Sequence, residues 1–213
     1  MKSPQPAVRR VSSSTSTGGA GTLFEQQVGA AFLSLLLVRG RPPILLDCAV
    51  TEVHLQTEHE GWTTDDILLV GVNGGGTRRR LVCQVKLKFT VSASDQECKD
   101  TIGDFWADFS ENSDFSADND RLAVVTLRGT NTLLGPFASL LDCARASRDA
   151  RDFEHRLQTP GFVNSTVIRY FGEIQTIASE RAARPVTVDD LWPFLKVLEG
   201  VFETLSHFSA ACW

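Results

Sequence analysis

The chain has 213 residues, of which 42% are hydrophobic and 22% charged, and its formal net charge is −5. This length suits one sizeable domain, and the composition is that of a soluble globular protein. The acidic balance excludes nucleic-acid binding through overall charge, so such binding would need a local basic patch. No apolar run is expected to reach the length of a membrane span, and no membrane partner is expected. The five cysteines form no CxxC pair, which favours a reducing, intracellular setting over a disulfide framework.

The N-terminal part combines a polar tail with an apolar helix. Residues 1–20 are rich in Ser, Pro and Gly and are expected to be disordered. Apolar residues then recur at helical spacing from Phe24 to Leu35, which predicts a helix over 22–38 that ends at the arginines and prolines of 39–43. Residues 44–57 favour a strand, with a helix as the open alternative.

A β-hairpin is predicted next. Two apolar strands, 66–72 and 79–89, flank the glycine-rich turn NGGGT. If the turn centres near Gly75, residues whose numbers add to about 150 lie opposite each other, and Asp66 then falls opposite Gln84.

The rest of the chain is predicted to be helical apart from one strand. Ser94 and Glu97 have the spacing of a capping box, so a helix should follow to about Phe109. Residues 121–127 are almost wholly apolar and predict a strand buried on both faces. Further helices are expected at about 132–145, 148–158, 164–182 and 188–205. The order predicts an α/β core, about 21–130, with a helical extension over about 131–205.

The second hairpin strand has a polar face that suggests chemistry. Side chains alternate along a strand, so Leu81 to Phe89 in steps of two form an apolar face, whereas Gln84, Lys86 and Lys88 lie on the other face. Carboxylate and amide oxygens are the hard ligands that Mg²⁺ prefers, and a nearby ammonium can stabilise charge on a phosphodiester. The alternative interpretation is a merely solvated strand face.

Glu25 is a further candidate because it falls inside the apolar sector of the first predicted helix. A buried carboxylate there has to be paired, at a helix end, or bound to a ligand. Since Glu25 lies in the first turn, stabilisation by the helix dipole is the alternative explanation.

The segments "TDDILL…CQVKLK" resemble the D…QxK form of the PD-(D/E)xK nuclease motif, as in Mrr-type restriction endonucleases. The segment "GGAGTLFEQQVGAAFLSLLL" looks like the opening helix of nuclease domains of bacterial antiphage effectors, which include cyclic-oligonucleotide-activated endonucleases and STAND NTPase defence proteins. "FWADF", "DRLAVVTL", "RDFEHRL" and "VTVDDLWPFLKVLE" are similar to the same group, so the resemblance spans about residues 18–199. It implies a restriction-endonuclease-like core with a central mixed sheet flanked by helices.

The resemblance also implies roles for individual residues. Asp66 would be the motif aspartate, with Asp65 as the competing candidate, Gln84 the variant of the second acid, and Lys86 the motif lysine. Glu25 would be the first-helix acid. Metal ligands would be Asp66, Gln84 and Glu25, with Mg²⁺ as the cofactor and Mn²⁺ as an alternative. The residues weighed as DNA-phosphate contacts are Arg78, Arg79, Arg80 and Lys88.

The implied function is Mg²⁺-dependent cleavage of double-stranded DNA with low sequence specificity, in antiphage defence in the bacterial cytoplasm. A fused or partner sensor or NTPase module and homo-oligomerisation are expected to control it. The nuclease domain would occupy 21–205. The chain would be an excised domain, a truncated protein or the product of a stand-alone gene, and the unfamiliar tail 206–213 favours truncation. The alternative is a catalytically inactive nuclease fold that serves as a DNA-binding or oligomerisation module.

Overall fold

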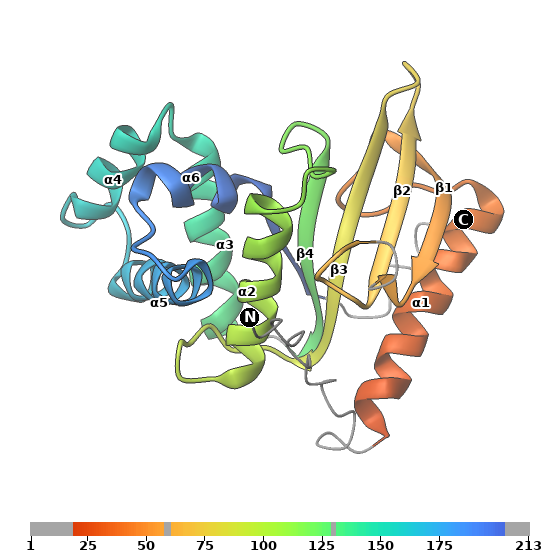
Figure 1. The fold of residues 1–213 in the computed structure, drawn as a ribbon, viewed down its shortest axis with the longest axis horizontal. Coiled ribbons are helices and arrows are strands. Elements are labelled where there is room, and N and C mark those ends of the chain that lie inside the picture. Colours follow the sequence, from red (N-terminus) through yellow and green to blue (C-terminus); the bar gives the residue numbers. More distant parts are fainter. Residues whose placement is uncertain (1–18, 58–60, 129–130, 203–213) are drawn as a thin grey trace, which may run out of the picture.

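The structure is a computed structural model that describes residues 19–57, 61–128 and 131–202. Residues 1–18 of the expected tail 1–20, and the expected tail 206–213, lie outside the described residues, whereas Ala20 already belongs to a helix. The described chain folds into a mixed, open five-stranded sheet with α1 on one face and the other helices on the opposite face (Figure 1). The helices are α1 (Ala20–Val38), α2 (Gln96–Ser110), α3 (Asn131–Ala146), α4 (Ala150–Gln158), α5 (Ser165–Ala182) and α6 (Val188–Val197). The strands are β1 (Cys48–Leu55), β2 (Ile67–Asn73), β3 (Arg78–Lys88), β4 (Asp120–Arg128) and β5 (Leu198–Phe202).

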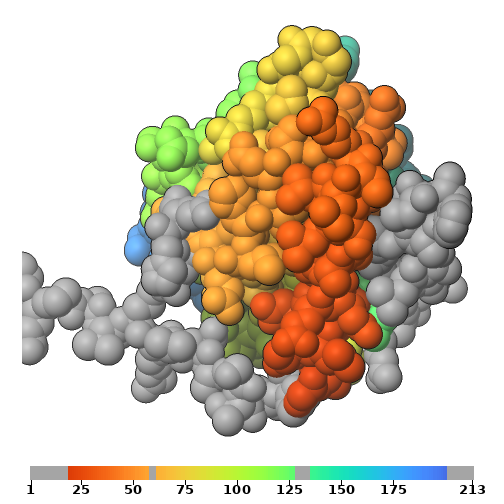
Figure 2. All heavy atoms as spheres, turned by 90° about the vertical axis from the view of Figure 1, so that its right-hand side faces the viewer, coloured from red at the N-terminus to blue at the C-terminus, as the bar shows by residue number. Residues whose placement is uncertain are grey.

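The first helix confirms the predicted apolar periodicity. Its buried side consists of Phe24, Val28, Gly29, Phe32 and Leu35, and it ends at Arg39, which adopts the left-handed conformation. Its outer face lies open in Figure 2 and carries exposed leucines; Leu37 is 85% exposed. By length and composition, α1 is apolar enough to cross a bilayer, with a mean hydropathy of 1.3. The expectation that no segment reaches that length is therefore corrected, although the core helix of a soluble protein passes the same test.

Strands β1, β2 and β3 form the antiparallel part of the sheet, which settles residues 44–57 as containing a strand. The turn between β2 and β3 is fixed by Asn73, whose Oδ1 accepts from the backbone N–H groups of Gly75 at 3.0 Å and Thr77 at 2.9 Å. Gly76 has φ +82°, a conformation that glycine adopts without steric strain. The turn chemistry therefore sets the register of the hairpin.

Helix α2 connects β3 to the parallel strand β4, and the predicted strand 121–127 is confirmed. The predicted capping residue is off by one position. Asp95, not Ser94, caps α2 by accepting from the backbone N–H of Cys98 at 2.9 Å. The Ser94 hydroxyl instead bonds to the Ser92 hydroxyl at 2.9 Å.

The last predicted helix, 188–205, is wrong in its second half. Helix α6 ends at Val197, and Leu198–Phe202 pairs with β4 as the parallel strand β5. The Arg145 guanidinium donates to the carbonyl oxygens of Lys196 and Leu198 and forms an ion pair with Glu199 at 2.9 Å, so it binds the chain where helix becomes strand. The helical extension thus returns to complete the sheet.

Two apolar cores lie on the two faces of the sheet. One forms between the sheet and α1, and the larger one between the sheet and helices α2–α6. The predicted alternation of β3 holds from Leu81 to Val85, which belong with Cys83 to the α1 core, and Leu87 packs against it. Phe89 is the exception, because β3 ends at Lys88 and Phe89 packs in the larger core.

Candidate active site on the β2–β3 hairpin

The hairpin has the register that the turn predicts. Ile67 lies opposite Cys83, and the pairing continues without a shift to Val72 opposite Arg78. One further step of this register places Asp66 level with Gln84, where the ladder ends. Side chains that meet at this position can interact directly.

Asp66 and Gln84 are in contact. The Gln84 Nε2 donates to Asp66 Oδ2 at 2.6 Å, and the backbone N–H of Val85 donates to the same oxygen at 2.6 Å. No hydrogen bond within the described residues reaches the other oxygen, Oδ1. The aspartate is therefore oriented by one oxygen while the other can accept a ligand.

Asp65 lies at the edge of the same contact. The Gln84 Nε2 reaches Asp65 Oδ1 at 3.4 Å, which is longer than its 2.6 Å bond to Asp66. The backbone carbonyls of both aspartates accept hydrogen bonds from 56–57, at 2.9 Å for Asp66 and 2.8 Å for Asp65. The geometry favours Asp66 as the aspartate bound to the β3 strand, with Asp65 as its neighbour.

Glu25 and Lys86 join this group through their charges. The pKa of Glu25 is raised, mainly by burial and then by the nearby Asp65 carboxylate, while Lys86 opposes the shift. The same Lys86 lowers the pKa of Asp66, and Glu25 raises it. Side chains from α1, the start of β2 and the end of β3 therefore share one electrostatic environment.

Asp66 is the most perturbed member of the group. Burial is the largest cause and raises its pKa to about 7; the Val85 amide and Lys86 oppose this rise, and Asp65 and Glu25 add to it. This carboxyl therefore titrates near neutral pH, where an ordinary aspartate is fully ionised. Three carboxyl groups and one ammonium influence one another through their charges, so the group has an excess of acidic residues that a cation would offset.

The polar face of β3 is solvated only toward its end. Gln84 is 4% exposed and Val82 is fully buried in the larger core beneath the helices. A buried amide and a buried carboxyl are costly unless they are paired. The interpretation as a merely solvated strand face is therefore wrong for Gln84, whereas Lys86 is half-buried and Lys88 exposed, as that interpretation expects.

The residues around Asp66 are only partly suited to bind a cation. Among the described residues, no three His, Cys, Asp or Glu side chains lie close enough together to form a metal site. Asp66 and Gln84 are in direct contact, so Asp66 Oδ1 and the Gln84 amide could supply two ligands. The amide would have to rotate, because its nitrogen now faces the carboxylates and its oxygen would be the ligand.

The arginines of the TRRR segment lie at the other end of β3. Each is paired with a carboxylate: Arg78 with Glu52 at 2.9 Å, Arg79 with Asp47 at 3.2 Å and Arg80 with Asp120 at 2.7 Å. Four residues of extended strand separate Arg80 from Gln84, a distance of roughly 13 Å. The structure therefore does not bring these arginines into the Asp66 group.

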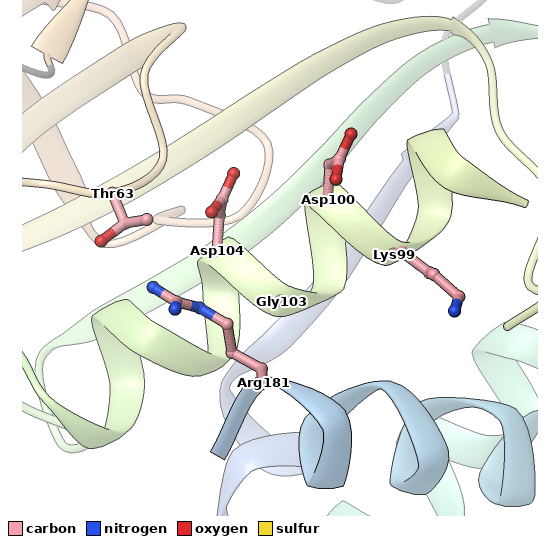
Figure 3. A pocket seen from close by; sticks show the side chains of 6 residues that line it. All are labelled: Thr63, Lys99, Asp100, Gly103, Asp104 and Arg181. Atoms are coloured by element: carbon pink, nitrogen blue, oxygen red, sulfur yellow. The ribbon is translucent and has the colours of Figure 1, made fainter. Parts of the chain in front are cut away.

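A pocket of about 480 Å³ lies where the Thr63 segment meets α2 and the end of α5 (Figure 3). Its charged residues are balanced, since two basic residues, Lys99 and Arg181, and two acidic residues, Asp100 and Asp104, line it. It shows neither the excess of carboxylates expected for a cation nor the excess of basic groups expected for a phosphate.

Sequence reasoning missed the residues that hold the segment before Asp65. The buried carboxylate of Asp108 in α2 accepts hydrogen bonds from the backbone of Thr63 and Thr64. A signal was present: Asp108 lies within the FWADF segment, three residues after Phe105 on the buried side of the helix, where an acid needs a partner.

Comparisons with protein-family models, with curated proteins and with solved structures find no match for this chain. The functional argument therefore depends on the residues and on their geometry.

Proposed function

We propose that this chain is a metal-dependent endonuclease that cleaves double-stranded DNA with low sequence specificity and serves as an effector in antiphage defence in the bacterial cytoplasm. The observation that carries the proposal is the contact of Asp66 with Gln84 at the end of the hairpin, within the electrostatic range of Lys86 and Glu25. These are the residues that the D…QxK resemblance assigns to catalysis, and they come from three separate elements. The mixed sheet flanked by helices supports, at the level of architecture, a restriction-endonuclease-like core.

The roles follow from the charges of the site. A bound Mg²⁺, or Mn²⁺ in its place, would polarise the scissile phosphate and lower the pKa of a water molecule. Asp66 Oδ1, Gln84 and Glu25 would hold the cation, and the Lys86 ammonium would orient the water and stabilise the negative charge that develops on the phosphate. Because Asp66 has a pKa of about 7, it must release a proton before it can bind a cation fully.

A plasmid-nicking assay tests the proposal. Wild-type protein should nick supercoiled plasmid with Mg²⁺ or Mn²⁺ and not with EDTA, and the Asp66→Asn variant should not nick it. Equal cleavage by both proteins would contradict the assignment. The expected fused or partner sensor and self-association are part of the proposal, and sedimentation of the protein with and without DNA would test the latter.

A second function is favoured by one observation. The Gln84 nitrogen, not its oxygen, faces the carboxylates, and no three metal-binding side chains of the classes above come together in the described residues. This arrangement suits a catalytically inactive nuclease fold that binds DNA or oligomerises. DNA binding without any Mg²⁺- or Mn²⁺-dependent nicking would support this second function over the first.

A further inference from the structure

The buried carboxylate of Asp108 joins α2 to the segment that leads into the candidate site. Its Oδ1 accepts from the backbone N–H of Thr63 at 2.6 Å and its Oδ2 from that of Thr64 at 2.9 Å. Asp108 is 0% exposed. Asp65 and Asp66 are the next two residues of the chain.

The same segment is held from its other side by Thr57. The Thr57 hydroxyl donates to the Thr64 carbonyl at 2.7 Å, and the Thr57 N–H donates to the Asp65 carbonyl at 2.8 Å. Thr57 is also 0% exposed. The backbone of 63–65 is thus bonded to Asp108 on one side and to Thr57 on the other, just before Asp66.

Trp62 anchors the start of this segment in the larger core. Its ring is buried there, and the Arg80 guanidinium lies 5.0 Å from the ring centroid. Arg80 itself is fixed by two hydrogen bonds to the buried Asp120, at 3.0 and 2.7 Å. The segment Trp62–Thr64 therefore has little freedom before it reaches Asp65.

A neutral side chain could not replace Asp108 in this role. Both of its oxygens accept from consecutive N–H groups, whereas an asparagine would turn its own NH₂ toward one of them. A fully buried carboxylate is expensive unless it is well bonded, and within the described residues Asp108 forms no ion pair. Its bonds go to two backbone amides that precede the candidate site directly.

We propose that Asp108 is a positioning residue that acts together with Thr57: the pair clamps Thr63 and Thr64 and so sets where the Asp66 carboxylate meets β3. The catalytic consequence of this clamp rests on the proposed nuclease function. The clamp itself is independent of that function. It sets a structural contact, the hydrogen bond from the Val85 N–H to Asp66 Oδ2.

The Val85 amide reports this contact directly. It lies beyond the last ladder pair of β2 and β3, and its N–H donates to Asp66 Oδ2 at 2.6 Å. If the clamp is released, Asp66 shifts and the Val85 amide loses this acceptor. The amide of Leu81, in the middle of the ladder, should not respond.

The experiment compares Asp108→Asn and Thr57→Val with Asp100→Asn as the matched control. Asp100 is an exposed acid on the same helix. It lines the same pocket as Thr63 but forms none of the hydrogen bonds of the clamp, so its variant removes one carboxyl group and leaves those bonds in place. Amide hydrogen exchange and chemical shifts are measured by NMR on the protein without DNA. We expect the Val85 amide to exchange at least about tenfold faster in both clamp variants, with Leu81 unchanged and the control like wild type.

The Thr57→Val variant distinguishes a displacement of Asp66 from an electrostatic effect of removing the Asp108 carboxylate. Asp108→Asn removes a negative charge near the carboxylates and could alter them at a distance, whereas Thr57→Val is uncharged. Faster Val85 exchange in both variants supports the clamp. A response in Asp108→Asn alone, or faster exchange confined to Thr63 and Thr64 with Val85 unchanged, overturns it. Loss of folding in both variants also overturns it, since these residues would then stabilise the whole domain.

Cleavage is the second readout. If the proposed function holds, both clamp variants should lower kcat by up to about 100-fold with the KM for DNA little changed, because a small displacement of a reacting group has an effect of that size. An unchanged kcat despite a displaced Val85 amide would overturn the positioning role. If wild-type protein cleaves no DNA while the Val85 amide responds, the proposed function fails and the clamp stands.

Discussion

The two ends of strand β3 carry opposite kinds of charge arrangement. At the turn end, Arg78, Arg79 and Arg80 each have a carboxylate partner. At the far end, the Lys86 ammonium lies within electrostatic range of the carboxyl groups of Asp66 and Glu25. Burial raises the pKa of Asp66 to about 7, and repulsion from Asp65 and Glu25 adds to this rise.

The two ends therefore differ in how their charges are compensated. The Arg78 and Arg79 ion pairs lie at the surface, where such pairs are near neutral in energy, and Arg80 offsets the buried carboxylate of Asp120. An unbalanced buried group is costly, so it persists where something else compensates it, and perturbed carboxyl groups gather at functional sites. The carboxyl-rich end of β3 is therefore the candidate site.

The largest expected effect is at Lys86. Lys86→Ala should reduce cleavage on the order of 10³-fold, because the ammonium that stabilises charge on the phosphate is lost. The fold should remain, since Lys86 is only half-buried and its removal opens no core cavity. Single-turnover cleavage and thermal melting by circular dichroism measure the two effects.

Lys99→Ala is the control for this variant. Lys99 forms an ion pair with Glu180 at 2.8 Å, away from the hairpin, so its loss should leave the cleavage rate unchanged. A near wild-type rate for Lys86→Ala would show that the lysine has no catalytic role.

The second effect concerns stability and pH. The folded-state pKa of Asp66, about 7, lies above its ordinary value of 3.8. Between these values the folded protein holds a proton that the unfolded chain has released. The free energy of unfolding should therefore fall as pH rises from about 4 to 7, by up to about 4 kcal/mol, and then level off.

Asp66→Asn should remove this part of the pH dependence and unfold at a higher temperature than wild type at pH 8. Thermal unfolding from pH 5 to 8, without divalent cations, checks both statements. A pH profile for Asp66→Asn that parallels wild type would place the perturbed carboxyl elsewhere.

The hairpin shows how far sequence could predict this site. A turn centred near Gly75 predicted that Asp66 lies opposite Gln84. The structure has this register, and the Asn73 side chain holds the turn. The burial of Gln84 could not be predicted, because it depends on helices α2–α6 that follow later in the chain and cover that face of the sheet.

Long-range contacts account for the other differences between the predicted and the observed structure. Asp108 lies 44 residues from Thr64, and no local pattern indicates that pairing. Strand β5 was predicted as helix because Leu198–Phe202 continues an apolar helical pattern, and only pairing with β4 and the hydrogen bonds from Arg145 make it a strand. Tertiary packing overrides local preference at such places.

The third expected effect is on the affinity of the protein for Mg²⁺. Gln84 supplies no charge, so Mg²⁺ should bind poorly to the free protein and well in the presence of DNA, whose phosphate adds a ligand. Gln84→Glu should keep activity and tighten Mg²⁺ binding, increasingly so above pH 7, because the new carboxylate would lie against Asp66 and share its proton at lower pH. Glu25→Gln should raise the Mg²⁺ concentration needed for half-maximal cleavage.

Calorimetry at pH 6 and pH 8 and a Mg²⁺ titration of cleavage measure these changes. Binding of Mg²⁺ should release protons at pH 6 and few at pH 8, since Asp66 has already lost its proton there. Tight binding to the free protein that Glu25→Gln leaves unchanged would place the metal site elsewhere.

The smallest expected effect is on the salt dependence of DNA binding, which distinguishes the two ends of β3. Each Lys or Arg that neutralises a DNA phosphate contributes roughly 0.9 to the slope of log affinity against log salt concentration. Arg78 already faces Glu52, whose carboxylate would repel a phosphate, so Arg78→Ala should change that slope very little. Lys88 is exposed at the carboxyl-rich end of the strand, so Lys88→Ala should lower the slope by about one phosphate contact.

DNA-binding titrations at several salt concentrations, in Ca²⁺ to prevent cleavage, distinguish the two variants. A larger change for Arg78→Ala than for Lys88→Ala would assign DNA contact to the turn end and reverse the comparison.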